Sequence, residues 1–146
     1  MADSYSEQVL KALYAKIQAA APSGALVARN AAYPESIPRD GAIILRDGNP
    51  GDPEFLFSPP CYVYEHYAEV DLLVEATRDD DRDAKFDVLK QAIGVAVSDD
   101  RTLGGLCDYV LGQAPAPVDL TDLGAIGLKA ATVGVILTYG TPDPLG

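Results

Sequence analysis

The feature that most constrains the fold is a segment of seventeen residues, Cys61–Thr77, in which apolar and acidic side chains alternate. Successive side chains of a β-strand point to opposite faces of the sheet. The alternation therefore predicts one long strand with a buried face and an acidic, solvent-exposed face. At about 3.3 Å per residue the strand would span roughly 55 Å, whereas typical strands have about 5–6 residues. A strand of this length can extend past its own core, which favours a component of an assembly over a self-contained enzyme.

Around this strand the sequence predicts two main helices and three further strands. Ser4 and Glu7 form a capping box ahead of apolar residues at helical spacing, which continue to Pro22. In chain order the predicted elements are a helix after Ser4, strands over 24–29 and 41–46, the long strand, a helix beginning near Asp79–Asp83, a turn and short helix over 99–111, and a last strand over 126–139 with Val133, Val135, Leu137 and Tyr139 on one face.

These elements predict an α+β fold in a single domain, residues 1–146. Because helices separate the last two strands, we expect a mixed or antiparallel sheet of about four strands, one of them very long, with helices mainly on one face. The strand over 41–46 is apolar on both faces and is expected near the centre of the sheet.

The segment Asp47–Pro60 contains four prolines and two glycines, which predict an irregular loop over most of its length. Loops this long are uncommon in compact domains and are usually functional or disordered. The loop also carries Phe55, Leu56 and Phe57. Two interpretations stand: the loop is a contact arm, or these three side chains fold back over the core.

The charge balance limits the classes of partner. The chain has 22 acidic and 11 basic residues, a net charge of −11. Nucleic-acid binding relies on Lys and Arg displacing counterions, so a firm grip on a phosphate backbone is not expected; solubility is the simplest explanation of the charge. The N-terminal residues do not resemble a signal peptide, and the longest apolar run is too short to cross a membrane. We expect an intracellular, reduced protein with no membrane partner.

The residues offer little for catalysis. His66 and Asp71 lie five residues apart on one strand, hence on opposite faces, and cannot form a His–Asp pair there; His66 is expected to be structural. Cys107 is expected to be a small core residue, and the acidic run Asp79–Asp83 a helix start rather than a calcium loop. Glu69, Asp71 and Glu75 are spaced like glycosidase carboxylates, but the chain has no Trp to suggest a sugar site. We therefore expect no catalytic residue, no cofactor and no metal.

Several segments together resemble the phage tail terminators, typified by the minor tail protein U of lambda, and are most similar to a branch found in alphaproteobacterial phages and prophages. The similar segments are Ile37–Gly48, Tyr64–Val70, Asp100–Asp108, Ile126–Ala131 and Tyr139–Leu145. The resemblance covers most of the chain from about residue 30 onward and contains no catalytic motif.

The resemblance implies a structural virion protein. Terminators of this kind form a hexameric ring that caps the tail tube, stops its polymerisation and faces the head-side connector, while DNA passes through the lumen without specific binding. Two alternatives are a head–tail joining or neck protein and a small enzyme that uses acyl-CoA, since members of the branch often carry an acyl-CoA transferase label. The expected contacts with other subunits or the neck are Asn49, Asp52, Glu54, Phe55, Leu56, Phe57, Glu65, Glu69, Asp71 and Glu75.

Overall fold

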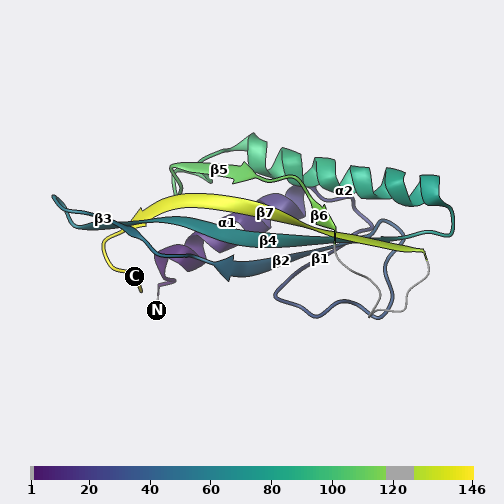
Figure 1. Cartoon of the computed structure of the whole chain (residues 1–146), viewed down its shortest axis with the longest axis horizontal. Helices are drawn as coiled ribbons and strands as arrows, with labels where there is room; N and C mark the ends of the chain where they lie inside the picture. Colours follow the sequence, from purple (N-terminus) through teal and green to yellow (C-terminus); the bar gives the residue numbers. More distant parts are fainter. Residues whose placement is uncertain (1, 118–126) are drawn as a thin grey trace.

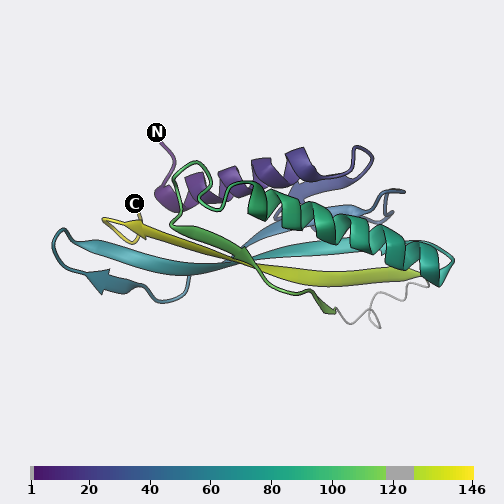
Figure 2. The same ribbon diagram turned by 90° about the horizontal axis from the view of Figure 1, so that it is seen from above.

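The structure, a computed structural model, describes residues 2–117 and 127–146. In chain order its elements are α1 (Tyr5–Ala20), β1 (Leu26–Arg29), β2 (Ala42–Asn49), β3 (Glu54–Leu56), β4 (Cys61–Glu75), α2 (Asp79–Asp99), β5 (Tyr109–Gly112), β6 (Ala116–Pro117) and β7 (Leu128–Thr141) (Figure 1). Both helices lie on the same face of the sheet (Figure 2). The predicted α+β class, with a mixed sheet and helices on one face, is confirmed.

Strand β4 runs through the middle of the sheet and sets its length. It has 15 residues, which confirms the predicted long strand, and it pairs with β7 from Tyr62 to Glu75. The strand order is β1-β2-β4-β7-β5, with β3 beside β4 and β6 beside β7. Strands β1 and β2 are parallel, whereas the other pairs are antiparallel.

The described residues form seven strands rather than about four. The four predicted strands correspond to β1, β2, β4 and β7. The additional strands β3, β5 and β6 have three, four and two residues. Runs this short are too brief for side-chain alternation to be recognised in a sequence. Ile126, at the start of the predicted last strand, lies outside the described residues.

The main core lies between the sheet and the two helices. Helix α1 begins where the Ser4 hydroxyl accepts a hydrogen bond from the Glu7 amide at 3.3 Å, which is half of the predicted capping box. The Glu7 carboxylate instead accepts hydrogen bonds from the Arg29 guanidinium at 2.7 Å and 2.8 Å. Burying each large apolar side chain contributes about 1.5–3 kcal/mol. The core joins four groups of side chains: Val9, Leu10, Leu13 and Ile17 of α1, Phe86, Leu89, Ile93 and Val97 of α2, Ala68, Val70, Leu72 and Val74 of β4, and Val133, Val135, Leu137 and Tyr139 of β7. It fixes β4 and β7 firmly against the helices.

The opposite face of the sheet is not uniformly acidic and exposed, so that prediction is wrong. Ala42, Ile44, Leu73 and Ala130 form a second, smaller apolar cluster there, and Ile37 packs against it. The connection between β1 and β2 thus brings an apolar side chain onto this face. Alternation within β4 could not reveal a cover supplied by another segment.

Helix α2 ends at Asp99, and the chain that follows forms turns and then β5 instead of the short helix predicted within 99–111. Leu103, Gly104 and Gly105 all have positive φ angles, which interrupt a right-handed helix. The Asp100 carboxylate accepts hydrogen bonds from the amides of Thr102 at 2.9 Å and Gly104 at 2.8 Å. These bonds hold the turn and lower the pKa of Asp100 to about 2.

Candidate functional site

One end of the molecule carries a β-hairpin extension, residues 50–60, which we call the arm (left in Figure 1). Within it β3 pairs with the beginning of β4, so that Glu54 lies opposite Val63 and Leu56 opposite Cys61. The predicted irregular loop over 47–60 is therefore wrong in part: β2 continues to Asn49, and β3 forms beyond it. The prolines lie on either side of β3 and leave its hydrogen bonds intact.

The base of the arm requires a glycine. Gly48 has a φ of +70°, and a Cβ at this position would lie 1.9 Å from the backbone oxygen of Tyr67. The pairing of β2 with β4 shifts register here, between Arg46 and Asn49. Such irregularities bend a strand and redirect it. Gly48 therefore permits the close strand contact from which the arm departs.

The apolar side chains of the arm are exposed. Phe55, Leu56 and Phe57 expose 39%, 46% and 77% of their surface. The Phe55 ring lies 4.9 Å, centroid to centroid, from both the Phe57 ring and the Tyr62 ring. Tyr62 packs against the main core, whereas the arm residues extend beyond it. The arm side chains therefore pack mainly on one another and do not cover the core.

The predicted contact residues do not form one surface. Asn49, Asp52 and Glu54 are exposed at the base and on the arm, and the Asn49 side-chain oxygen accepts a hydrogen bond from the Gly51 amide at 2.9 Å. Glu65 and Glu75 are both exposed, but they lie near different ends of β4, ten residues apart. Glu69, between them, is half-buried. Only the residues of the arm and its base come together.

Asp71 is buried, so its predicted place on an exposed face is wrong. It exposes only 4% of its surface. Its carboxylate accepts hydrogen bonds from Arg46 Nε at 2.8 Å and Thr132 Oγ1 at 2.7 Å. Tyr33 lies over the Arg46 guanidinium, with its ring centroid 5.4 Å away. Asp71 therefore joins β2, β4 and β7 across the sheet and is a structural residue.

His66 has the contacts expected of a structural histidine. Its Nε2 lies 2.6 Å from the backbone oxygen of Asp47, and its Nδ1 lies 2.7 Å from the Tyr139 hydroxyl. Because a carbonyl oxygen can only accept, Nε2 donates to the Asp47 oxygen, and Nδ1 and the Tyr139 hydroxyl share the second hydrogen bond. The ring thus ties the end of β2, next to the arm, to β7.

Cys107 is a buried thiol in a protonated state. Burial raises the pKa of Cys107 to about 12, and the negative charge of Asp108 contributes in the same direction. The thiolate, rather than the thiol, is the nucleophile in cysteine chemistry. Near neutral pH this side chain is therefore poorly suited to covalent catalysis and serves as part of the core.

The protein is expected to lose stability in alkaline solution through Cys107 and Tyr139. Burial raises the pKa of each to about 12, from ordinary values of 9.0 and 10.0. Above about pH 9 these two groups begin to ionise in the unfolded chain but stay protonated in the folded protein. Their contribution to the free energy of unfolding is therefore fully present below pH 9 and is lost as the pH rises toward 12. We expect a lower urea midpoint at pH 10 than at pH 8, and a smaller difference for Cys107→Ala. Equal pH dependence of the variant and the natural chain would exclude a contribution from the thiol.

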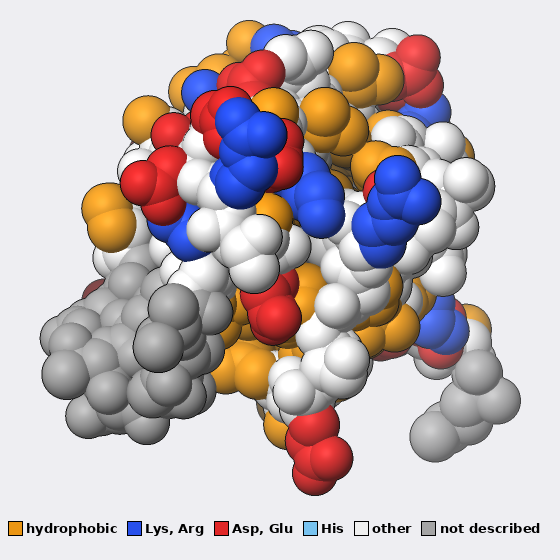
Figure 3. Space-filling model, turned by 90° about the vertical axis from the view of Figure 1, so that its right-hand side faces the viewer, with side chains coloured by type: hydrophobic (Ala, Val, Ile, Leu, Met, Phe, Trp, Pro, Cys, Tyr) orange, Lys and Arg blue, Asp and Glu red, His pale blue; other side chains and the backbone are white. Residues whose placement is uncertain are grey.

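Charges at the end opposite the arm are largely paired. Lys and Arg side chains gather on this end, with acidic side chains among them (Figure 3). Arg78 pairs with Asp80 at 3.1 Å and Lys129 with Asp83 at 2.9 Å, and Arg82 pairs with Asp79. In residues 2–117 and 127–146, no group of three or more His, Cys, Asp or Glu side chains is placed to hold a metal ion. The acidic run thus begins α2 and forms ion pairs.

None of the described helices is long and apolar enough to span a membrane.

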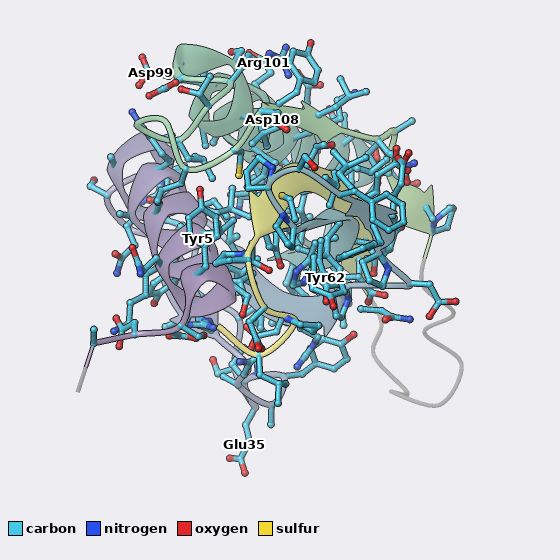
Figure 4. The ribbon with its side chains drawn as sticks, turned by 90° about the vertical axis from the view of Figure 1, so that its left-hand side faces the viewer. Tyr5, Glu35, Tyr62, Asp99, Arg101 and Asp108 are labelled. Carbon is cyan, nitrogen blue, oxygen red and sulfur yellow. The ribbon has the colours of Figure 1, made fainter. Side chains whose placement is uncertain are left out.

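A groove between α2 and the chain that follows β5 was not predicted from the sequence. It has a cavity volume of about 390 Å³, with Ile93, Val97 and Val133 on its apolar lining and Lys90 and Arg101 among its other residues. Figure 4, viewed from the arm end, shows Arg101 on the α2–β5 side of the molecule and Tyr62, next to the arm, well away from it. Lys90 and Arg101 belong to no sequence motif. Only the folding of the chain brings them to the same groove.

No protein-family model matches the chain, and no curated protein matches it in sequence. Among solved structures, it is similar to the PVC sheath/tube terminator of an extracellular contractile injection system, determined by cryo-EM in the extended state. The TM-score is 0.50 and the sequences are 14% identical; the match covers 94% of this chain and 57% of that one. The chain thus spans little more than half the length of its structural neighbour. At this identity the similarity establishes a shared fold.

Proposed function

We propose that the protein is a tail terminator: a structural subunit of a homohexameric ring that caps the tail tube, stops its polymerisation and joins the tail to the head-side connector. The observation that carries this proposal is the similarity of fold, over 94% of the chain, to a sheath/tube terminator. Sequence segments that resemble phage tail terminators support it independently of the fold.

The exposed arm also supports a role in assembly. Soluble monomers rarely present contiguous apolar surface without a function for it. Here Phe55, Leu56 and Phe57 are exposed together on a hairpin at one end of the molecule. A ring subunit needs such a surface for each neighbour, whereas a self-contained domain does not.

The acidic composition suits a ring around a DNA channel. Each chain carries a net charge of −11. Repulsion between this charge and phosphates disfavours specific or persistent DNA contact. The proposed ring would therefore let DNA pass through its lumen without binding it. This role requires no turnover, no cofactor and no metal.

The test is to image the particles by cryo-EM and to measure tube length with and without the protein. We expect a six-fold ring of this chain where the tail tube ends, facing the connector, and tubes of uncontrolled length when the chain is omitted. If the density for this chain lies on the head side of the connector, and tubes made without the chain have normal length, the protein is instead a neck protein. A ring with another rotational symmetry would contradict the proposed hexamer, and turnover of a CoA thioester by the purified protein would contradict a purely structural role.

A further inference from the structure

We infer that the arm of one copy docks into the α2–β5 groove of a second copy, so that successive subunits join arm to groove. This inference rests on the proposed ring and identifies the contact that builds it. The arm and the groove are different surfaces in different parts of the chain (Figures 1 and 4). A contact between two different patches is heterologous, and it produces a closed ring when its rotation closes.

The apolar surfaces of the two partners match. The arm presents Phe57, the most exposed of its three apolar residues, beside Phe55. The groove offers Leu111, which exposes 45% of its surface, together with Ala114 and Pro115. The largely buried Ile93, Val97 and Val133 form its floor, and its volume is about 390 Å³. That volume lies within the range of about 300–1,000 Å³ that accommodates small ligands, and exposed aromatic side chains are common anchors at protein interfaces.

The charges are complementary as well. The arm carries Asp52 and Glu54, both exposed. Lys90 lies in the groove, and its one ion pair with a described residue is a long contact, 3.6 Å, with Asp87 on its own helix. A basic groove beside apolar walls therefore fits an acidic arm with aromatic side chains. Complementary charge gives an interface its specificity and register.

Arg101 is held in place for such a contact. Its Nη1 donates to the backbone oxygen of Val110 at 3.0 Å, and its guanidinium lies 5.5 Å from the Tyr109 ring centroid. Eight of the eleven Lys and Arg side chains form ion pairs with described residues, but Arg101 forms none with them. In a chain with few positive charges, this guanidinium is fixed at the groove with donors available to an acidic partner.

The inference predicts an exchange of specificity between two charge-reversed variants, Glu54→Arg and Arg101→Glu. Alone, each variant places like charges at every arm–groove contact, and we expect its self-association to weaken by about tenfold or more. Mixed in equal amounts, they form complementary contacts in an alternating arrangement, so association should return. The measurements are sedimentation velocity of the purified chains and photo-crosslinking from a benzoyl-phenylalanine at position 57.

The crosslinked peptide identifies the contact even where association is weak. We expect the benzoyl-phenylalanine at position 57 of one copy to link to residues 90–115 or to Val133 of another copy. The link should form in the otherwise natural chain and in the mixture but not in either variant alone. Glu35→Arg and Arg39→Glu serve as matched controls, because both residues are exposed and form no ion pair with a described residue. Their crosslinking should equal that of the natural chain.

Several outcomes would overturn the inference: no crosslink between copies, a crosslink to another surface, or a mixture that behaves like its separate components. A crosslink from the arm to the tube protein in particles with a normal terminal ring would refute this contact and leave the proposed function intact. If the arm crosslinks to the groove but imaging shows that the chain is absent from the end of the tail, the terminator role is refuted and the arm-to-groove contact stands.

Discussion

Replacing Phe55 and Phe57 together with serine is expected to abolish the joining of tails to heads while leaving the fold intact. Both residues are exposed and contact each other and Tyr62 more than the core, so the free energy of unfolding should fall by about 1 kcal/mol or less. Loss of both aromatic side chains removes most of the apolar surface of the arm. Circular dichroism and a thermal melt measure the fold, and the yield of complete particles measures assembly.

A matched control is the pair Val88→Ser and Val95→Ser on the outer face of α2. These residues are also apolar and exposed, by 53% and 58%. They should tolerate serine with no loss of assembly. If the arm variant unfolds, the aromatic residues belong to the core. If it yields complete particles at the normal level, the arm makes no essential contact.

Replacing Asp71 with alanine is expected to lower the free energy of unfolding by about 3 kcal/mol, the lower end of the range for breaking a buried ion pair. The change leaves the Arg46 guanidinium and the Thr132 hydroxyl without the carboxylate they donate to, at 2.8 Å and 2.7 Å. The lower end applies because the Arg46 side chain remains 32% exposed. Urea denaturation of the purified chain measures the difference.

Glu65→Ala on the same strand is the control for Asp71→Ala. Glu65 lies on the same face of β4 as Asp71 but is exposed. Its replacement should change the free energy of unfolding by no more than about 0.5 kcal/mol. Equal effects of the two substitutions would mean that Asp71 does not hold the sheet together. A loss of assembly without a loss of stability in Asp71→Ala would return this residue to the interface.

The long elements could be predicted because their patterns repeat. Fifteen alternating residues define β4, and four apolar residues at helical spacing define α1. Pattern failed where tertiary contacts decide: Asp71 alternates like an exposed residue, but Arg46 and Thr132 lie beside it across the sheet. It also failed over 99–111, where Gly104 and Gly105 permit a turn that apolar spacing does not reveal.

The candidate site could be predicted only on one side. A run of Phe55, Leu56 and Phe57 between prolines is visible in the sequence, and it marked the arm. The groove has no such mark, because Lys90 and Arg101 are ordinary charged residues eleven positions apart that face a strand more than thirty residues further along. A local motif can indicate a protruding surface, whereas its receptor depends on packing.

The separation between the arm and the core bears on how such proteins diverge. Residues 50–60 are all exposed, while His66 and Gly48 fix the base from which they extend. Substitutions at exposed positions usually change stability by no more than about 0.5 kcal/mol. The arm can therefore accumulate mutations that alter which chains recognise one another, while the remainder of the domain stays under selection for folding. Under the proposed arm-to-groove contact, related particles that assemble in the same cell would in this way keep their subunits from mixing.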